Sequence, residues 1–401
     1  MTTIAKKYIK LAEPFVGPEE MEALQATLGS GWLTQGPKVR EFEEAFAARH
    51  RTKYAVAVSS GTTALHLALL AVGIQPGDLV IVPSFTWVAT ANAVVYCGGQ
   101  PLFCDSCRDT YNINPAALAQ LLNDLTKQGL NPKAVIPVHL FGLGAQMDAI
   151  NELAGRYGLK VVEDAACASG AGINGRPLGG QSDVSCFSFH PRKTITTGEG
   201  GMCLTNDERI AEAIRRSRNN GASLSPRQLA GKNMPFLMAD YNELGFNFRL
   251  SDLAGAMGTV QLARLDSLIA ERRILAARYD QAVKNLGWLT APHTPPGYEH
   301  SYQAYVCRLN YGSASNRDRL MAGLHEAGIG SRAGTQAVHE LGYYRAKYGL
   351  RSEDFPVASQ LAANTISLPL HNRLSHEELE KVIETLDHVY STLQEQPMVD
   401  S

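Results

Sequence analysis

One stretch of this chain decides its fold, and it reads Ser185-Cys186-Phe187-Ser188-Phe189-His190-Pro191-Arg192-Lys193-Thr194-Ile195-Thr196-Thr197-Gly198-Glu199-Gly200-Gly201. The apolar residues 184–189 predict a short buried strand. This strand delivers Lys193 into a turn of small and hydroxyl residues that ends in Gly-Glu-Gly-Gly. An apolar pocket favours the neutral amine of a lysine, which can then form a Schiff base with a carbonyl compound. Most lysines lie on the surface, so the rest of the chain must decide between the two interpretations.

Length and composition describe an ordinary globular protein. The chain has 401 residues, which is enough for two domains and a large core. Its formal net charge of -2 gives no basic field for nucleic acid or an anionic membrane. The first residues lack the apolar segment of a signal peptide, and no apolar run approaches the roughly 20 residues that span a bilayer. We therefore expect a cytoplasmic protein.

The seven cysteines are odd in number and irregularly spaced, so they predict no disulfide framework. Cys104 and Cys107 form a CxxC, but no second pair and no histidine at zinc spacing accompany them. A structural zinc site needs four ligands. We expect no metal in this protein.

Strands and helices alternate between residues 54 and 205. Apolar runs predict strands at 54–58, 79–83, 101–105, 134–140, 159–166, 184–189 and 202–205, most of them separated by helical segments. This alternation predicts an α/β fold with a mainly parallel sheet, in which ligands bind at the carboxyl ends of the strands. The residues expected at these ends are Gly61, Thr62, Trp87, Asp164 and Lys193.

The segment Ser59-Ser60-Gly61-Thr62-Thr63 follows the first of these strands and precedes a helix over 64–72. Free backbone N–H groups and the helix dipole face such a turn, so it can bind a phosphate. Serine and threonine also cap helices without any ligand. Trp87 falls at the mouth of the next strand, where open α/β sheets bind ligands, although core packing is the commoner role of tryptophan.

Asp164 ends a buried strand and is followed by two alanines. An ionised acid at this place suits the nitrogen of a protonated pyridine ring, as in pyridoxal phosphate (PLP), whose aldehyde a lysine can hold. The alternative is an aspartate that caps the following turn.

The run Gly170-Ala171-Gly172-Ile173-Asn174-Gly175 fits the dinucleotide pattern G-x-G-x-x-G. That pattern should open a helix, whereas Arg176-Pro177-Leu178-Gly179-Gly180 follows here and disfavours one. We therefore expect no nicotinamide or flavin site.

The C-terminal part has a different pattern. A long helix is predicted over Ser251 to Leu286, with Ser251 as its N-cap, and α+β elements follow from about 288. We expect a large domain at 1–265, including an N-terminal arm, and a small domain at 266–401, with the long helix joining them.

Taken together, these motifs resemble the DegT/DnrJ/StrS family of PLP-dependent sugar aminotransferases, which have the fold-type I architecture. The resemblance covers nearly the whole chain. It rests on segments 30–36, 59–65, 83–92, 163–166, 187–193, 198–201 and 245–249.

The resemblance implies roles for single residues in the cofactor site. Lys193 would form the internal aldimine with PLP, and Asp164 would pair with the pyridine nitrogen. Trp87 would stack on the ring. The phosphate would be held by Gly61, Thr62 and Ser188 and, from a neighbouring subunit, by Asn247. The family therefore implies a homodimer with shared active sites, in which His190, Arg249 and His339 border the substrate pocket.

Two positions depart from the family pattern. Relatives usually have glutamine where this chain has Cys167, and that side chain normally contacts the cofactor ring. A thiol is a weak donor, so the contact is lost or made differently here. The usual Arg-x-His-Gly reads Arg218-Asn219-Asn220-Gly221, which puts the role of that histidine in doubt.

The resemblance implies an enzyme of amino-sugar and polysaccharide biosynthesis that moves an amino group from L-glutamate to a nucleotide-linked keto-deoxysugar. The run Gly334 to Tyr344 looks like perosamine-synthase-type relatives, which favours a 4-keto-6-deoxyhexose. A 3-keto-sugar aminotransferase, a PLP-dependent sugar dehydratase and a PLP-binding regulator without turnover are the alternatives. Family dehydratases have histidine at the position of Lys193. The carrier nucleotide and the configuration of the amine stay open.

Overall fold

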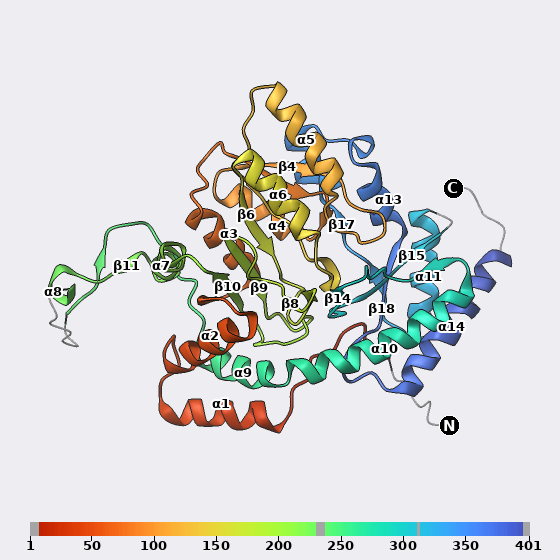
Figure 1. Ribbon diagram of the computed structural model, residues 1–401. Helices are drawn as coiled ribbons and strands as arrows, with labels where there is room; N and C mark the ends of the chain where they lie inside the picture. Colours follow the sequence, from red (N-terminus) through yellow and green to blue (C-terminus); the bar gives the residue numbers. More distant parts are fainter. Residues whose placement is uncertain (1–7, 230–236, 311–312, 396–401) are drawn as a thin grey trace.

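The computed structural model describes residues 8–229, 237–310 and 313–395. It has a large α/β part and a smaller part at the C-terminal end, and one long helix runs between them (Figure 1). Within the described ranges, no helix combines the length and the apolar character that a membrane crossing needs.

The large part is built on a seven-stranded sheet in the order β1-β10-β9-β6-β5-β2-β4. β10 runs antiparallel to both of its neighbours, and the other neighbouring pairs are parallel. The fold class predicted from the sequence is therefore confirmed. The strands are β1 (Tyr54–Val58), β2 (Leu79–Pro83), β4 (Gln100–Cys104), β5 (Ala134–Val135), β6 (Lys160–Asp164), β9 (Val184–Ser188) and β10 (Gly201–Thr205).

Helices cover both faces of this sheet, because its strands are apolar on both sides. One face packs against α3 (Gly61–Ala71), α4 (Ala89–Tyr96) and α7 (Glu208–Ser217). The other face packs against α2 (Pro37–His50), α5 (Pro115–Lys127), α6 (Met147–Tyr157) and α9 (Asp252–Ala263). α1 (Pro18–Ser30) lies outside, against α9 (Figure 1).

Two sequence predictions were wrong in their extent. The strand expected over 134–140 ends at Val135, and residues 140–142 form a 3₁₀ turn instead. Pro137 has no N–H to continue a ladder. The single long helix is two helices, α9 and α10 (Leu265–Leu286), because Arg264 leaves the helical conformation at φ -104°. Its guanidinium is held by Glu19 and Glu20 of α1. Ser251 is confirmed as N-cap, accepting from Ala254 N at 3.2 Å.

The small part is an antiparallel sheet in the order β13-β15-β18-β16, covered by helices. Its core includes Tyr279 of α10 and, from the N-terminal arm, Ile9, which pairs with Ile329. We propose the domain boundary near residue 265, since the start of α10 packs on the large part and its later turns pack here. The elements are β13 (Leu289–Thr290), β15 (Tyr305–Leu309), α11 (Ala314–Glu326), β16 (Arg332–Ala333), α12 (Gly342–Tyr348), α13 (Pro356–Asn364), β18 (Thr365–Leu368) and α14 (His376–Glu395).

Short elements complete the chain. β11 (Ala222–Ser223) and β12 (Asp240–Tyr241) form a hairpin that projects from the body together with α8 (Pro226–Leu229) (Figure 1). Residues 230–236, between α8 and β12, lie outside the described residues. The others are β3 (Phe85–Thr86), β7 (Gly172–Ile173), β8 (Arg176–Pro177), β14 (Tyr298–Glu299) and β17 (Gln336–Ala337). β7 and β8 form a hairpin where the G-x-G-x-x-G pattern lies, so no helix opens there.

Candidate active site

Lys193 lies in the turn that follows β9, as the sequence predicts. The turn is tied by its own backbone: Lys193 N donates to His190 O at 2.8 Å, and Phe189 N donates to Gly200 O at 2.9 Å. The amine Nζ reaches across to the segment after β6 and donates to Cys167 Sγ at 3.2 Å. Both side chains are partly exposed, so the amine is open to a bound molecule.

Asp164 is the last residue of β6, and its register partner on β9 is Cys186. The residue is only 5% exposed, and its carboxylate accepts from Thr90 Oγ1 at 2.7 Å and from Ala166 N at 3.2 Å. Over the described ranges of the chain, it takes part in no ion pair. A buried carboxylate with only neutral donors is costly. The side chain is therefore suited to a cation that is not part of this chain.

Glu163, the neighbouring acid, has a different environment. It accepts from His139 Nε2 at 2.7 Å and from Ser185 Oγ at 2.9 Å, and all three side chains are buried. Ala145 N donates to His139 Nδ1 at 3.0 Å, so Nε2 carries the proton. Burial raises the pKa of Glu163, but the hydrogen bonds from His139, Ser182 and Ser185 outweigh it and hold this pKa below its usual value. Glu163 is thus paired within the chain.

The turn after β1 has the geometry of a phosphate site. Ser60 caps α3 by accepting from Thr63 N at 3.1 Å. The first-turn amides of Gly61 and Thr62 have no intrahelical acceptor and face outward with the positive end of the helix dipole. A Cβ on Gly61 would come 2.8 Å from Cβ of Ser188. Glycine therefore lets the end of β9 lie directly against the start of α3.

Trp87 follows β3 at the same edge of the sheet. Its side chain is 56% exposed, so it does not serve the core packing that was the alternative interpretation. The next helix, α4, begins two residues later and carries Thr90. Thr90 was not singled out from the sequence, and nothing in the pattern marks it, because its partner Asp164 lies 74 positions away.

Three of the remaining predicted residues lie around this edge. His190 is partly buried and accepts from Arg192 N at 3.2 Å; burial lowers its pKa, and Glu199 opposes this. Arg249 Nη1 donates to Asn219 Oδ1 at 2.8 Å. Asn247 is exposed and pairs through its backbone with Asn219.

His339 lies in the interior of the chain, next to the end of β2. It is fully buried, with Nδ1 hydrogen-bonded to the hydroxyl of Ser84 and Nε2 to Ser359 Oγ at 3.1 Å. Its ring lies against Phe355, with centroids 4.7 Å apart. These contacts join Ser84, which follows β2, to Ser359 of α13, and a role of His339 at the substrate pocket stays a prediction.

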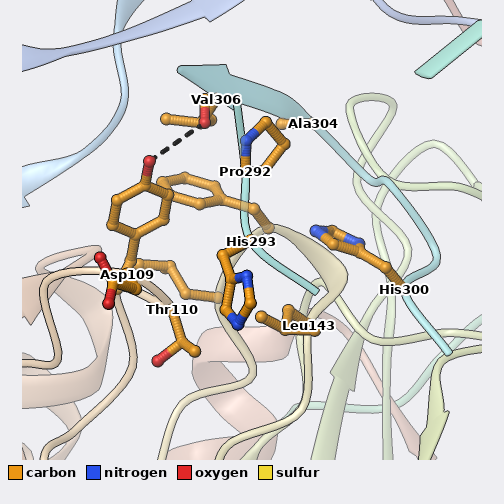
Figure 2. Close-up of a pocket in the computed structure, with 11 residues that line it drawn as sticks. Asp109, Thr110, Leu143, Pro292, His293, His300, Ala304 and Val306 are labelled. Atoms are coloured by element: carbon orange, nitrogen blue, oxygen red, sulfur yellow. Dashed lines mark hydrogen bonds between the residues drawn. The ribbon is translucent and has the colours of Figure 1, made fainter. Parts of the chain in front are cut away.

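A separate small cavity lies where the loops of the large part meet the small part (Figure 2). It is lined by Asp109, Thr110, His293, His300 and Val306, among others, and the hydroxyl of Tyr111 donates to Val306 O at 3.3 Å above it. Its volume of about 10 Å³ holds at most one water. Burial and the charge of Arg273 lower the pKa of His300 to about 3, so this ring is neutral. The cavity is a packing defect, too small for a cofactor.

The arrangement around Lys193 fits PLP. It offers an amine for the aldehyde, a buried carboxylate without a cation for the ring nitrogen, a helix N-terminus for the phosphate and an exposed tryptophan for the ring face.

Comparisons with known proteins agree with a PLP-dependent enzyme. The model of the DegT/DnrJ/EryC1/StrS aminotransferase family matches residues 14–387. GDP-perosamine synthase of Caulobacter vibrioides is 37% identical, covering 95% of this chain and 98% of the relative. The spore coat polysaccharide biosynthesis protein SpsC of Bacillus subtilis is 36% identical over 94% and 96%. The solved structure of Spr1654 from Streptococcus pneumoniae in its PLP form superimposes with a TM-score of 0.86 at 27% identity, covering 96% of this chain and 99% of that one. The chain belongs to the DegT/DnrJ/EryC1/StrS aminotransferase family, and it is a PLP-dependent aminotransferase.

Proposed function

We propose that this enzyme transfers the amino group of L-glutamate to a nucleotide-linked 4-keto-6-deoxyhexose in amino-sugar biosynthesis. The observation that carries the chemistry is the buried carboxylate of Asp164, which has neutral donors only and lies at the same sheet edge as Lys193. Bound PLP supplies an electron sink for the carbanion that forms at the donor's α-carbon.

Lys193 and Asp164 are proposed to have different roles in the reaction. Nζ of Lys193 would act as the general base that takes the proton from the donor's α-carbon and as the acid that delivers it to C4′ of the cofactor. The carboxylate of Asp164 would pair with the ring nitrogen, and the hydroxyl of Thr90 holds that carboxylate in place at 2.7 Å. Gly61, Thr62 and Ser188 would hold the phosphate, and Trp87 would cover the ring face.

The acceptor sugar is proposed from the relatives. The chain is similar over almost its whole length to a GDP-perosamine synthase, and the run Gly334 to Tyr344 resembles such enzymes. His190 and Arg249 are proposed to contact the substrate. A 3-keto sugar is the second candidate acceptor. The presence of Lys193 disfavours the dehydratase alternative.

A homodimer with shared sites is also part of the proposal. The hairpin of β11 and β12 projects from the body (Figure 1), and it carries or precedes exposed apolar side chains, among them Leu224, Met238 and Leu244. Exposed apolar groups on a projecting arm favour an interface. Asn247, exposed beside this arm, would reach the phosphate of the partner. All seven cysteines are unpaired, which supports a reducing, cytoplasmic environment.

The test is amino transfer itself. The purified enzyme is first converted to its pyridoxamine form with L-glutamate. It is then incubated with a panel of 4-keto and 3-keto sugars linked to GDP, dTDP or UDP, and amino-sugar formation is followed by mass spectrometry. We expect transfer to a 4-keto-6-deoxyhexose. Lys193→Ala should abolish transfer, whereas Lys127→Ala, at an exposed position of α5, should leave it unchanged. Wild-type rates in Lys193→Ala would overturn the assignment, and transfer to 3-keto sugars alone would overturn the proposed acceptor.

A further inference from the structure

Residues 300–304 join the small part to the lysine turn, which we define as residues 190–197, and to the segment that carries Cys167. Ser301 N donates to Gly142 O at 3.0 Å, and Ser301 Oγ donates to Cys167 O at 3.4 Å. Two residues later, Gln303 Nε2 donates to Arg192 O at 2.7 Å. Because the acceptor is a carbonyl, the amide nitrogen of glutamine must make this bond. Gln303 therefore connects the small part directly to the lysine turn.

The bond from Gln303 acts on the peptide group that precedes Lys193. Arg192 O and Lys193 N belong to one planar peptide group. Its oxygen accepts from Gln303, and its N–H donates to His190 O at 2.8 Å. The plane to which Cα of Lys193 is attached is thereby held on both sides, which limits how far the lysine side chain can swing.

The other end of the lysine turn is held from within the large part. Thr196 N donates to Oε1 of Gln261, a residue of α9, at 3.2 Å. Gln261 Nε2 donates in turn to Phe15 O at 2.7 Å and to Glu20 Oε1 at 2.8 Å. Gln261 is 1% exposed and Gln303 is 9% exposed. The turn thus lies between two buried glutamines, of which Gln303 comes from the small part.

The backbone just before Gln303 is strained. Tyr302 has φ 48°, in the left-handed region that bulky side chains rarely adopt. Tyr302 N donates to His300 Nδ1 at 2.9 Å, and the buried Arg272 donates to Tyr302 O at 3.1 Å and to Gln303 O at 3.4 Å. Strained backbone persists where several contacts hold it, and it gathers at functional sites. Here it turns the chain at the point where the amide of Gln303 reaches the large part.

We propose that Gln303 is a positioning residue for Lys193, through which the small part sets the direction of the amine. Gln303 acts on Lys193 through the peptide group that Lys193 shares with Arg192. The placement of Nζ matters because a displacement of about 1 Å at a reacting group can cost roughly 100-fold in rate. This inference rests on the proposed role of Lys193 as the residue that holds the cofactor and moves the proton.

The variants for the test change the hydrogen bond with little change in volume. Gln303→Met keeps the length of the side chain and removes the donor, and Gln303→His restores an N–H at a similar reach. Tyr111→Phe is the matched control. It removes another hydrogen bond between the two parts, from the hydroxyl of Tyr111 to Val306 O at 3.3 Å, which does not involve the lysine turn.

Three measurements follow each variant. The apo protein is mixed with PLP, and the absorbance change at saturating PLP gives the rate at which the amine captures the aldehyde. The PLP-loaded protein is mixed with L-glutamate, and the absorbance of the bound cofactor gives the rate at saturation and the half-saturating concentration. Thermal unfolding without cofactor gives the stability.

We expect Gln303→Met to lower the two saturating rates about tenfold or more, because Nζ is less well placed. The half-saturating glutamate concentration should stay within about twofold of wild type, since the binding of glutamate is not the step that changes. Gln303→His should recover most of the loss. Tyr111→Phe should keep both rates, although its unfolding midpoint should fall about as far as that of Gln303→Met.

Wild-type rates in Gln303→Met, or an equal loss of rate in Tyr111→Phe, would overturn the positioning role. If Gln303→Met does not fold, Gln303→Asn decides the question, because its amide is one methylene too short to reach Arg192 O. Wild-type rates in that variant would overturn the role as well.

Failure of the proposed function would look different. If Lys193 does not hold the cofactor, Lys193→Ala would still react with PLP at the wild-type rate. If only the proposed acceptor is wrong, the rates with PLP and with L-glutamate would be unaffected, because no sugar enters either measurement.

Discussion

Glu163 and Asp164 are neighbours on β6, yet the chain completes the surroundings of the first and leaves those of the second incomplete. Successive side chains of a strand point to opposite faces. Glu163 meets His139 and Ser185, and every polar atom of this buried set is matched within the chain. Asp164 meets only the hydroxyl of Thr90 and one amide. A carboxylate with its partners in the chain serves stability, whereas one without a cation is available for a ligand.

A substitution of Asp164 tests the contrast between the two acids most directly. Asp164→Asn keeps the size of the side chain and removes its charge. We expect kcat to fall roughly 100- to 5,000-fold, because a buried opposite charge is worth about 3–5 kcal/mol to its partner. Steady-state kinetics with the panel sugar that the wild-type enzyme aminates measures this, and the midpoint of thermal unfolding without cofactor should change little or rise. A kcat within twofold of wild type would show that the cation expected at Asp164 is absent from the reaction.

Glu163→Gln tests the acid whose hydrogen-bond partners all lie within the chain. Its amide would present N–H groups to donors at His139 and Ser185, so we expect the free energy of unfolding to fall by about 2–4 kcal/mol. Urea denaturation measures this, and Glu152→Gln on the exposed face of α6 should cost almost nothing. The kcat of the folded variant should stay near wild type. Loss of activity without loss of stability would assign Glu163 to the reaction.

The same pair predicts a pH dependence. The pKa of Glu163 is held below its ordinary value of 4.5 by the hydrogen bonds from His139 and the serines, which outweigh burial. The unfolded chain therefore takes up this proton at a higher pH than the folded chain does. The contribution of Glu163 is fully present above pH 4.5 and is lost as the pH falls through the lowered folded pKa. The stability difference between wild type and Glu163→Gln should shrink over that window.

Thr90→Val tests the surroundings of Asp164 more finely, because it removes one hydrogen-bond donor and leaves the carboxylate in place. The methyl group replaces the hydroxyl at nearly equal volume, so the carboxylate keeps its charge and loses the bond of 2.7 Å. One such bond is worth about 1.5 kcal/mol, so kcat/KM should fall about tenfold. Thr126→Val on α5, whose hydroxyl bonds only to Leu122 O, is the matched control. Equal effects of the two substitutions would mean that Thr90 acts through the stability of the fold.

The sequence predicted the sheet and most of its edge residues because those signals are local. Strand, turn and helix at Tyr54 to Val72 lie within a few residues of each other, and so do β9 and Lys193. The parts that sequence reasoning missed depend on distant partners. Thr90 meets Asp164 across 74 positions, and His339 meets Ser84 across 255. Arg264 interrupts the long helix where acids of α1 reach it. No periodic pattern records such pairs, because each forms only after the elements have packed.

Cys167→Gln should have the smallest effect on turnover, and it tests the contact between Cys167 and Lys193. The thiol lies 3.2 Å from Lys193 Nζ, and a thiol is a weak donor and acceptor. Installing the family's usual glutamine should change kcat by no more than about threefold. The identity of residue 167 should have a much larger effect on inactivation by thiol reagents. Cys167 and Cys107 are partly exposed, whereas the other five cysteines are buried. Iodoacetamide should therefore inactivate wild type and Cys107→Ser at equal rates and leave Cys167→Gln active. Inactivation of Cys167→Gln at the wild-type rate would place the sensitive thiol elsewhere and remove Cys167 from the surroundings of the lysine.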